Sequence, residues 1–474
     1  MKKILKKSIG CMLLGLGGLT TITSCSEDFP GNVESDKFTD LKEIRIVNAG
    51  PAGDQVLKGE IDELTKTIKF PQLDTLSDLQ NVKFEAVLSD GAKLEKDVFA
   101  LPYTSGETQK EVYLKVVNSP RFKEYKAIVR YNVVLRGINL ETTEVYDYSL
   151  NPFGNPMYPS FATANTRGTG FDGNYVLVAE RAGVGLHLLE VAKLKQNIVE
   201  PILLNTEGVT GGTFAYSMAA QINGHSYVAN LSGPLKIYHW ANPSDKPDLI
   251  ASIALGDFGL TARHGDALSI DLDDNGNGFA YTMSGDGNII RVKISNYKDG
   301  SDVTVIKPRI NYEQWGHYSN IKGTEDYMIS GHSQVPSLAN NAGSLQYTLG
   351  ANTLPRSISD LKIFTFNDQR YLLGITVPRN APTVGAALYI FNISKGETIV
   401  DALTALDQSA VSGKNAPYVF TYTLTSTVNG NPGTQAGYHI VKDDNGKDSK
   451  LMIYGATTTG GFAIIEFDAH ENEL

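Results

Sequence analysis

Arginine, histidine, aspartate and tryptophan side chains gather in a few short polar segments of this chain. These segments are residues 261–266, 313–318, 180–181, 331–333 and 378–379. An indole with nearby hydrogen-bond donors and carboxylates suits stacking on a sugar ring or another flat ligand. These residue types together predict a ligand-binding site.

Eight side chains in these segments are the candidate ligand contacts: Arg181, Arg263, His264, Asp266, Trp315, His317, His332 and Arg379. For Trp315 the alternative is packing between structural repeats. For His264 with Asp266 the alternative is a structural hydrogen bond. Trp240 follows an alternating strand pattern, which indicates packing and not binding.

The sequence identifies no catalytic residues. It contains no G-x-S-x-G elbow, no Walker A loop and no H-E-x-x-H helix motif. An enzyme remains the alternative to a binding protein, because a hydrolase or lyase can collect its acids from distant segments. Arg263, His264 and Asp266 are then its expected centre.

One acidic turn resembles half of a calcium loop. Asp271, Asp273 and Asn275 place oxygen atoms at positions 1, 3 and 5, and Gly276 follows. Position 12 is Thr282 where such loops carry glutamate. The pattern therefore favours an ordinary hairpin turn, with calcium as the alternative, and no other cofactor is expected.

An internal repeat in the sequence predicts the fold that positions the candidate side chains. Each unit has an aromatic-bearing strand, a glycine-rich loop and an apolar strand. The marker tyrosines are 175, 227, 281, 327 and 371, at intervals of 52, 54, 46 and 44 residues, and Tyr454 follows after 83. Such spacing is typical of a β-propeller. We expect one over residues 141–468, with six blades favoured, seven the alternative, and residues 145–150 closing the last blade.

Propeller topology places the candidates together. Loops that enter the innermost strands and loops that join the two middle strands share one face of the ring. Each candidate falls in one of these two kinds of loop. We therefore expect all eight around one mouth of the central channel.

Residues 41–136 show a different pattern. Short segments alternate between apolar and polar residues, as at residues 43–47, 82–87 and 112–117, and turn residues separate them. About a hundred residues of this kind predict an Ig-like β-sandwich. The fold class is therefore all-β, a sandwich followed by a propeller.

The first 24 residues have the layout of a secretory signal. Lys2, Lys3, Lys6 and Lys7 precede an apolar stretch that ends at residues 22–25, Ile-Thr-Ser-Cys. This ending resembles the lipobox of bacterial lipoproteins, which implies acylation of Cys25. Covalent lipid attaches a protein to a membrane without crossing it. Residues 25–40 are then a flexible tether.

The net charge and the cysteine content argue against a nucleic-acid-binding protein and against a disulfide-stabilised one. The formal charge is −10, and removal of the four signal lysines brings it to about −14. Such a balance argues against nucleic-acid partners. The chain has 2 cysteines; because Cys11 leaves with the signal and Cys25 is acylated, no disulfide is expected.

The chain as a whole resembles a Bacteroidota surface lipoprotein family that pairs an Ig-like module with a propeller-like domain of unknown function. Residues 26–28, Ser-Glu-Asp, resemble the acidic export signal of such lipoproteins. The resemblance implies the outer membrane facing the exterior, with the periplasmic face as the alternative. The lipid anchor, the tether, the small spacer domain and the large β head together form a presentation device, and we expect a non-catalytic binding protein that captures glycans beside an outer-membrane transporter. A protein-binding scaffold is a third interpretation.

Overall fold

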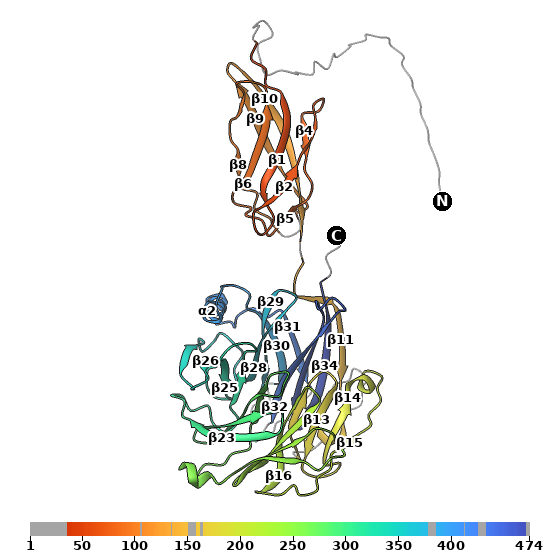
Figure 1. The fold of residues 1–474 in the computed structure, drawn as a ribbon, viewed down its shortest axis with the longest axis vertical. Coiled ribbons are helices and arrows are strands. Elements are labelled where there is room, and N and C mark those ends of the chain that lie inside the picture. The colour runs from red at the N-terminus through yellow and green to blue at the C-terminus, as the bar shows by residue number, and fades with distance from the viewer. Residues whose placement is uncertain are drawn as a thin grey trace, which may run out of the picture. The chain divides into compact units, whose positions relative to one another are not determined.

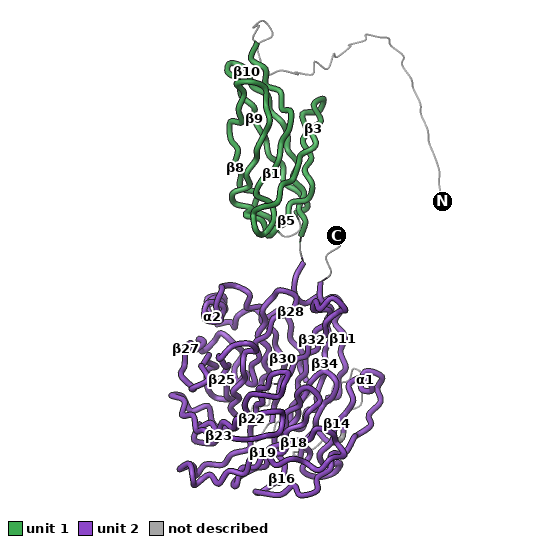
Figure 2. Tube along the Cα trace, in the orientation of Figure 1, with its two compact units in different colours: residues 1–134 green, residues 135–474 purple. Residues whose placement is uncertain are grey.

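The computed structural model describes residues 36–104, 107–133, 135–149, 158–161, 165–377, 385–411, 413–424 and 433–470. They form two compact units, and the division falls after residue 134 (Figure 2). The sequence placed the end of the first domain at residue 136, two residues later. Cys25 and Arg379 lie outside the described residues.

The first unit consists of two sheets with one shared core. One sheet has the order β2-β1-β6-β8, and the other has the order β3-β4-β10-β9-β7 with β5 beside β10. The strands are β1 (Leu41–Ala49), β2 (Gln55–Lys58), β3 (Glu60–Asp62), β4 (Thr67–Lys69), β5 (Leu73–Asp74), β6 (Val82–Leu88), β7 (Lys93–Leu94), β8 (Val98–Phe99), β9 (Gln109–Asn118) and β10 (Arg121–Asn132). Alternate residues such as Ile44 and Ile46 of β1 and Leu114 and Val116 of β9 enter the core. The three segments whose alternation predicted strands lie in β1, β6 and β9.

The described residues of the second unit form six separate sheets of four antiparallel strands, and Figure 1 shows how the elements are arranged. The first three are β12 (Thr166–Phe171), β13 (Tyr175–Glu180), β14 (Leu186–Glu190) and β15 (Ile202–Leu203); β16 (Phe214–Ile222), β17 (His225–Leu231), β18 (Leu235–Trp240) and β19 (Asp248–Ile253); and β20 (Ser269–Leu272), β21 (Gly278–Met283), β22 (Ile289–Ser295) and β23 (Asp299–Ile306). The next two are β24 (His317–Asn320), β25 (Asp326–Ser330), β26 (Ser337–Asn340) and β27 (Leu345–Thr348); and β28 (Ile358–Phe366), β29 (Gln369–Thr376), β30 (Ala386–Asn392) and β31 (Phe420–Leu424). The sixth joins β32 (Thr434–Lys442), β33 (Asp448–Thr457) and β34 (Gly461–Ala469) to β11 (Ile138–Asp147).

The sheets follow one another in a closed cycle. The first strand of each sheet contacts the first strand of the next, in the order β12, β16, β20, β24, β28, β32 and back to β12. Buried apolar side chains form six clusters in this unit, one between each sheet and its successor. Because every sheet is covered on both faces, most residues of the second strands are buried.

The repeat in the sequence arises because a marker tyrosine occupies the same position in each sheet. All six lie in the second strand of a sheet, and five of them are buried. Their hydroxyl groups reach the neighbouring sheet: Tyr227 donates to the carbonyl of Tyr297 at 2.8 Å, and Tyr281 donates to the hydroxyl of Tyr327 at 2.8 Å. A tyrosine at this position therefore fills the space between two sheets and satisfies its own polar group.

The last sheet takes its outer strand from the start of the unit. β11 pairs antiparallel with β34, with Val145 opposite Ile465. This confirms the strand expected to complete the last repeat, although it begins at Ile138 and ends at Asp147, and not at residues 145–150. The 83-residue interval before Tyr454 holds no additional sheet among its described residues.

Helices are few and short. The α-helices are α1 (Val191–Leu194) and α2 (Ile399–Ser409), and single 3₁₀ turns occur at Pro159–Phe161 and Leu255–Phe258. The all-β pattern of the sequence did not predict α2. Thr398 and Asp401 form a capping box, and Leu403 and Leu406 are buried. Within the described part of the chain, neither helix is long and apolar enough to cross a membrane.

Candidate functional site

The predicted contacts occupy the expected connections. Arg181 follows β13 and His332 follows β25, each between the second and third strand of its sheet. Arg263, His264 and Asp266 precede β20, and Trp315 and His317 lie immediately before and at the start of β24. Their side chains do not form a single cluster, since the pocket beside His332 does not include Arg181, Arg263 or Asp266.

The first cluster holds three guanidinium groups and one carboxylate. Arg263 donates from Nε to Oδ2 of Asp266 at 2.7 Å. Arg167 and Arg181 are close enough that their charges affect the pKa of Asp266. Burial nevertheless dominates and raises the pKa of this carboxyl group above its ordinary value, against the three arginines, which act to lower it. We call these four residues the arginine cluster.

Arg181 is the most constrained member of the arginine cluster. One terminal amino group donates to Oγ of Ser217 at 2.7 Å, and the guanidinium lies 4.0 Å from the centre of the Phe214 ring. Burial, assisted by the charges of Arg167 and Arg263, lowers its pKa to about 10. Arg181 therefore stays charged at neutral pH while it is packed against an aromatic ring.

Arg167 was missed by the sequence analysis. It is the second residue of β12 and half-buried, and burial is the main cause that lowers its pKa. Its signal was weak, because it is a single arginine beside Gly168 with no other unusual residue nearby. It joins Arg181, Arg263 and Asp266 only because three sheets of the cycle meet at this point.

The second cluster is built around Trp315. The half-buried indole meets the His332 ring edge to face, with centroids 5.7 Å apart. Nδ1 of His332 lies 3.1 Å from Oε2 of Glu313, and Ser333 donates to Oε1 of Glu313 at 2.6 Å.

By contrast, Trp240 is 1% exposed and donates its Nε1–H to the carbonyl of Asn205, which confirms that it is a packing residue.

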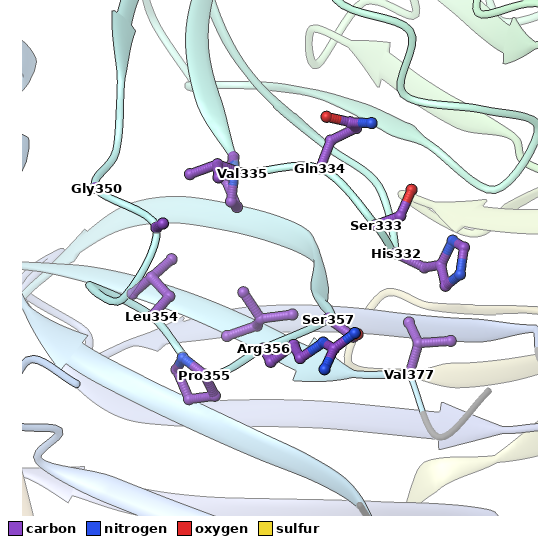
Figure 3. Close-up of a pocket in the computed structure, with 13 residues that line it drawn as sticks. His332, Ser333, Gln334, Val335, Gly350, Leu354, Pro355, Arg356, Ser357 and Val377 are labelled. Atoms are coloured by element: carbon purple, nitrogen blue, oxygen red, sulfur yellow. The ribbon is translucent and has the colours of Figure 1, made fainter. Parts of the chain in front are cut away.

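A pocket of about 430 Å³ adjoins the second cluster (Figure 3). His332 to Pro336 form one wall, and residues 350–351 and 354–358 with Val377 form the other. Arg356 is the charged residue of the second wall. The pocket lies between the fourth and fifth sheets and does not include the arginine cluster.

The structure buries two of the expected contacts. His264 is 0% exposed, its Nδ1 lies 3.3 Å from Oγ1 of Thr282, and burial lowers its pKa to about 4. His317 is 4% exposed and lies 3.4 Å from Asp360. Both imidazoles were expected to face a ligand, but neither is accessible at this face. The loop that carries His264 packs against the preceding sheet, where the backbone N–H of Ser232 donates to the carbonyl of His264 at 2.9 Å, and His317 lies at the start of β24 and faces Asp360 of the next sheet.

Polar side chains fill the axis of the cycle below these clusters. Asp360 accepts from Lys362 at 2.7 Å and from the backbone N–H of Ala436 at 2.8 Å. Gln435 accepts from the backbone N–H of Thr169 at 2.5 Å and donates to the carbonyl of Ala219 at 2.9 Å. The Asp360–Ala436 and Gln435–Thr169 bonds join the first strands of successive sheets, and the Gln435–Ala219 bond reaches the sheet after the next.

The acidic turn closes a hairpin between β20 and β21. Oδ1 of Asp273 accepts from the backbone N–H groups of Asn275 and Asn277, both at 2.9 Å. Oδ2 of Asp271 accepts from the Tyr327 hydroxyl in the next sheet at 3.2 Å. Across the described ranges, no group of three or more His, Cys, Asp or Glu side chains is placed to hold a metal ion. The bonds of Asp273 are those of a hairpin turn.

Comparison with known proteins places the chain in a family. Residues 27–470 match the family described as a domain of unknown function, DUF4623. The chain belongs to the DUF4623 family. No curated protein matches it.

A solved structure from the same family supports the fold. It is the crystal structure of a DUF4623 family protein from Bacteroides eggerthii DSM 20697, with 36% sequence identity, 92% coverage of this chain, 100% coverage of that chain and a TM-score of 0.69. Two others are the BBS1N–ARL6DN complex (13% identity, 63% of this chain, 76% of that chain, TM-score 0.33) and the WD40 β-propeller domain of Doa1 (10%, 64%, 92% and 0.34). These last two are too distant to support an argument.

The two tryptophans of this DUF4623 chain provide matched variants. Trp315→Ala should weaken ligand binding by about 1 kcal/mol, the scale of an aromatic contact, with little change in melting temperature. Trp240→Ala should instead lower stability by about 3–5 kcal/mol, because it empties a buried site. Thermal denaturation and a titration with an identified ligand measure both effects. A large drop in melting temperature for Trp315→Ala, or unchanged affinity, contradicts a binding role for Trp315.

Proposed function

We propose that this DUF4623 chain is a lipid-anchored, non-catalytic binding protein that captures glycans at the cell surface for an uptake system. The first unit is an Ig-like spacer and the second is a six-bladed β-propeller that presents the ligand site. Six four-stranded sheets in a closed cycle, the last completed by β11, support the propeller assignment.

One observation carries the choice between binding and hydrolysis. A glycoside hydrolase of the usual kind needs two carboxyl groups that flank the bond to be broken. Asp266, the half-buried carboxylate of the arginine cluster, has Arg263, Arg181 and Arg167 as its main charged neighbours instead of a second carboxylate. Guanidinium groups around a single carboxylate suit recognition of a ligand.

The raised pKa of Asp266 is the observation that favours an enzyme, because a general acid must hold its proton near neutral pH. Incubation of the protein with neutral and acidic polysaccharides, followed by analysis of reducing ends or unsaturated products, separates the two functions. We expect binding without products. Products that disappear in Asp266→Asn would establish the hydrolase or lyase instead.

Anchoring rests on Cys25, which lies outside the described residues. We expect Cys25→Ala to abolish membrane association, because the lipobox cysteine is the acyl acceptor. Both units should still fold, since their cores begin at β1. Fractionation of cells and thermal unfolding of the released protein test this. Recovery of the variant in the outer membrane would show that another feature anchors the chain.

A further inference from the structure

The pocket between the fourth and fifth sheets has an apolar floor and a polar edge. The floor is formed by Leu354, Ile358 and Val377, which are buried. The edge is formed by Gln334 and Arg356, which line the same pocket and are exposed. In Figure 3 the Arg356 side chain extends along one wall between Leu354 and Val377, and Gln334 belongs to the other wall. Such a pocket suits a ligand group that is apolar at one end and polar at the other.

The lining distinguishes between classes of ligand group. Among the described residues that line the pocket, none is aspartate or glutamate, and none is phenylalanine, tyrosine or tryptophan. Aliphatic side chains offer no flat ring for stacking, but burial of a methyl group against them is favourable. The guanidinium of Arg356 and the amide of Gln334 are hydrogen-bond donors, which a carbonyl oxygen can accept. An acyl group has both the methyl and the carbonyl.

The wall that carries Arg356 is fixed by the helix α2. Oδ1 of Asp407 accepts from the backbone N–H of Gly350 at 3.0 Å, and its Oδ2 accepts from the Tyr347 hydroxyl at 2.5 Å. Beyond the end of α2, Nδ2 of Asn415 donates to the carbonyl of Leu354 at 2.8 Å. Because these bonds already hold the segment in place, little conformational freedom is lost when a ligand binds.

The opposite wall is held as well. Ser333 donates to Oε1 of Glu313 at 2.6 Å, and the carbonyl of Pro336 accepts from the backbone N–H of Leu349 at 3.1 Å, which joins the two walls at one end. Glu313 and Ser357 have backbone φ angles of 65° and 61°. Residues other than glycine rarely adopt this conformation, and it occurs preferentially at ligand sites.

We propose that this pocket binds the acetamido group of an N-acetylated sugar, with the methyl group on the apolar floor and the carbonyl oxygen at Arg356 and Gln334. This inference rests on the proposed glycan-binding function and names the substituent that is recognised. The volume of about 430 Å³ is in the range of small-molecule sites. His332 lines the pocket and meets the Trp315 ring with centroids 5.7 Å apart. The pocket therefore lies next to the indole that is expected to stack on the sugar ring.

The test compares sugars that differ only in the acetamido group. Saturation-transfer NMR on residues 26–474, which contain both compact units, compares N-acetylglucosamine with glucose and N-acetylgalactosamine with galactose. Isothermal titration compares the tetrasaccharides of chitin and cellulose, which share linkage and length. We expect the strongest saturation at the acetyl methyl group. The acetylated tetrasaccharide should bind about tenfold more tightly, the scale of one buried methyl group and one hydrogen bond. Salt should not change the affinity, because the group is uncharged.

Variants connect the binding to the pocket. Val335→Trp fills the space from a half-buried position in the lining and should lower the affinity about tenfold. Arg356→Ala should lower it about fivefold, the scale of one hydrogen bond. Val411→Trp, at an exposed position outside the pocket, and Arg130→Ala, on β10 of the first unit, are the matched controls and should leave the affinity unchanged. Melting temperatures show whether Val335→Trp still folds, and Arg356→Ala at an exposed position remains informative if it does not.

The outcomes separate the pocket from glycan binding in general. Methyl saturation that is lost in Val335→Trp and kept in Val411→Trp supports the proposal. Equal binding of acetylated and parent sugars, binding that neither pocket variant lowers, or binding of other polysaccharides alone overturns the acetamido site and leaves glycan binding intact. Salt-sensitive binding of galacturonate in place of the acetylated sugars would assign a carboxylate to Arg356 instead. Failure to bind any polysaccharide in a broad neutral and acidic panel contradicts both this inference and the proposed function.

Discussion

Asp360→Asn is expected to lower the free energy of unfolding of the second unit by about 3 kcal/mol or more, the cost of breaking a buried ion pair. The Asp360 side chain is 3% exposed and contacts Lys362 at 2.7 Å and His317 at 3.4 Å. Without the carboxylate, the ammonium group of Lys362 lacks its buried counter-charge. Asparagine suits the position because the backbone φ of Asp360 is 49°, which asparagine tolerates. Chemical or thermal denaturation measures the loss.

Two further variants isolate the ion pair. Asp274→Asn removes an exposed carboxylate, 3.9 Å from Lys322 in a pair that is 81% and 87% exposed, and should change stability by about 0.5 kcal/mol or less. Asp360→Asn combined with Lys362→Met removes both charges and should recover part of the loss. Equal melting temperatures for the wild type and Asp360→Asn would show that the axis does not depend on this ion pair.

The pH dependence of this loss of stability follows from the direction in which the pKa of Asp360 is shifted. Burial acts to raise the pKa of Asp360, but Lys362, His317 and the hydrogen bonds outweigh it and hold the pKa below the ordinary 3.8. A carboxyl group with a lowered pKa in the folded state contributes stability above the pKa of the unfolded state. The difference between wild type and Asp360→Asn should therefore persist at neutral pH and close only as the pH falls below 3.8.

The repeat could be predicted because one residue has the same structural task in every sheet. A tyrosine such as Tyr227 or Tyr281 fills the gap to the next sheet and bonds across it, so its spacing gives the spacing of the sheets. The helix α2 was not predicted because it is only 11 residues long and lies in the irregular 83-residue interval between Tyr371 and Tyr454. Its capping pair, Thr398 and Asp401, was the available signal.

The site was harder to predict than the fold. Topology placed the candidates in the right connections, but it could not say which side chains point outward. His317 is buried because its partner Asp360, 43 positions later, lies on the adjacent first strand. Arg167 and Arg181 belong to the first sheet and Arg263 precedes the third, yet the charges of Arg167 and Arg263 both act to lower the pKa of Arg181. Such encounters depend on how neighbouring sheets are rotated and how closely they approach, which no local pattern records.

Gly168 shows how close that approach is. β12 and β16 belong to different sheets, yet a Cβ at Gly168 would lie 2.4 Å from the backbone nitrogen of Ala219 and 2.5 Å from the carbonyl oxygen of Ser217. Gly170, two residues along the same face of β12, would place a Cβ 2.3 Å from the backbone nitrogen of Gln221. Only glycine at both positions lets the two strands pack backbone against backbone.

Gly168→Ala is therefore expected to cost about 1–3 kcal/mol or more, because the clash is with backbone that cannot rotate away. Gly256→Ala is the matched control, since a Cβ there meets nothing within 4 Å, and it should be nearly neutral. Denaturation of both variants measures the effect. Unchanged stability of Gly168→Ala would mean that β12 and β16 can separate.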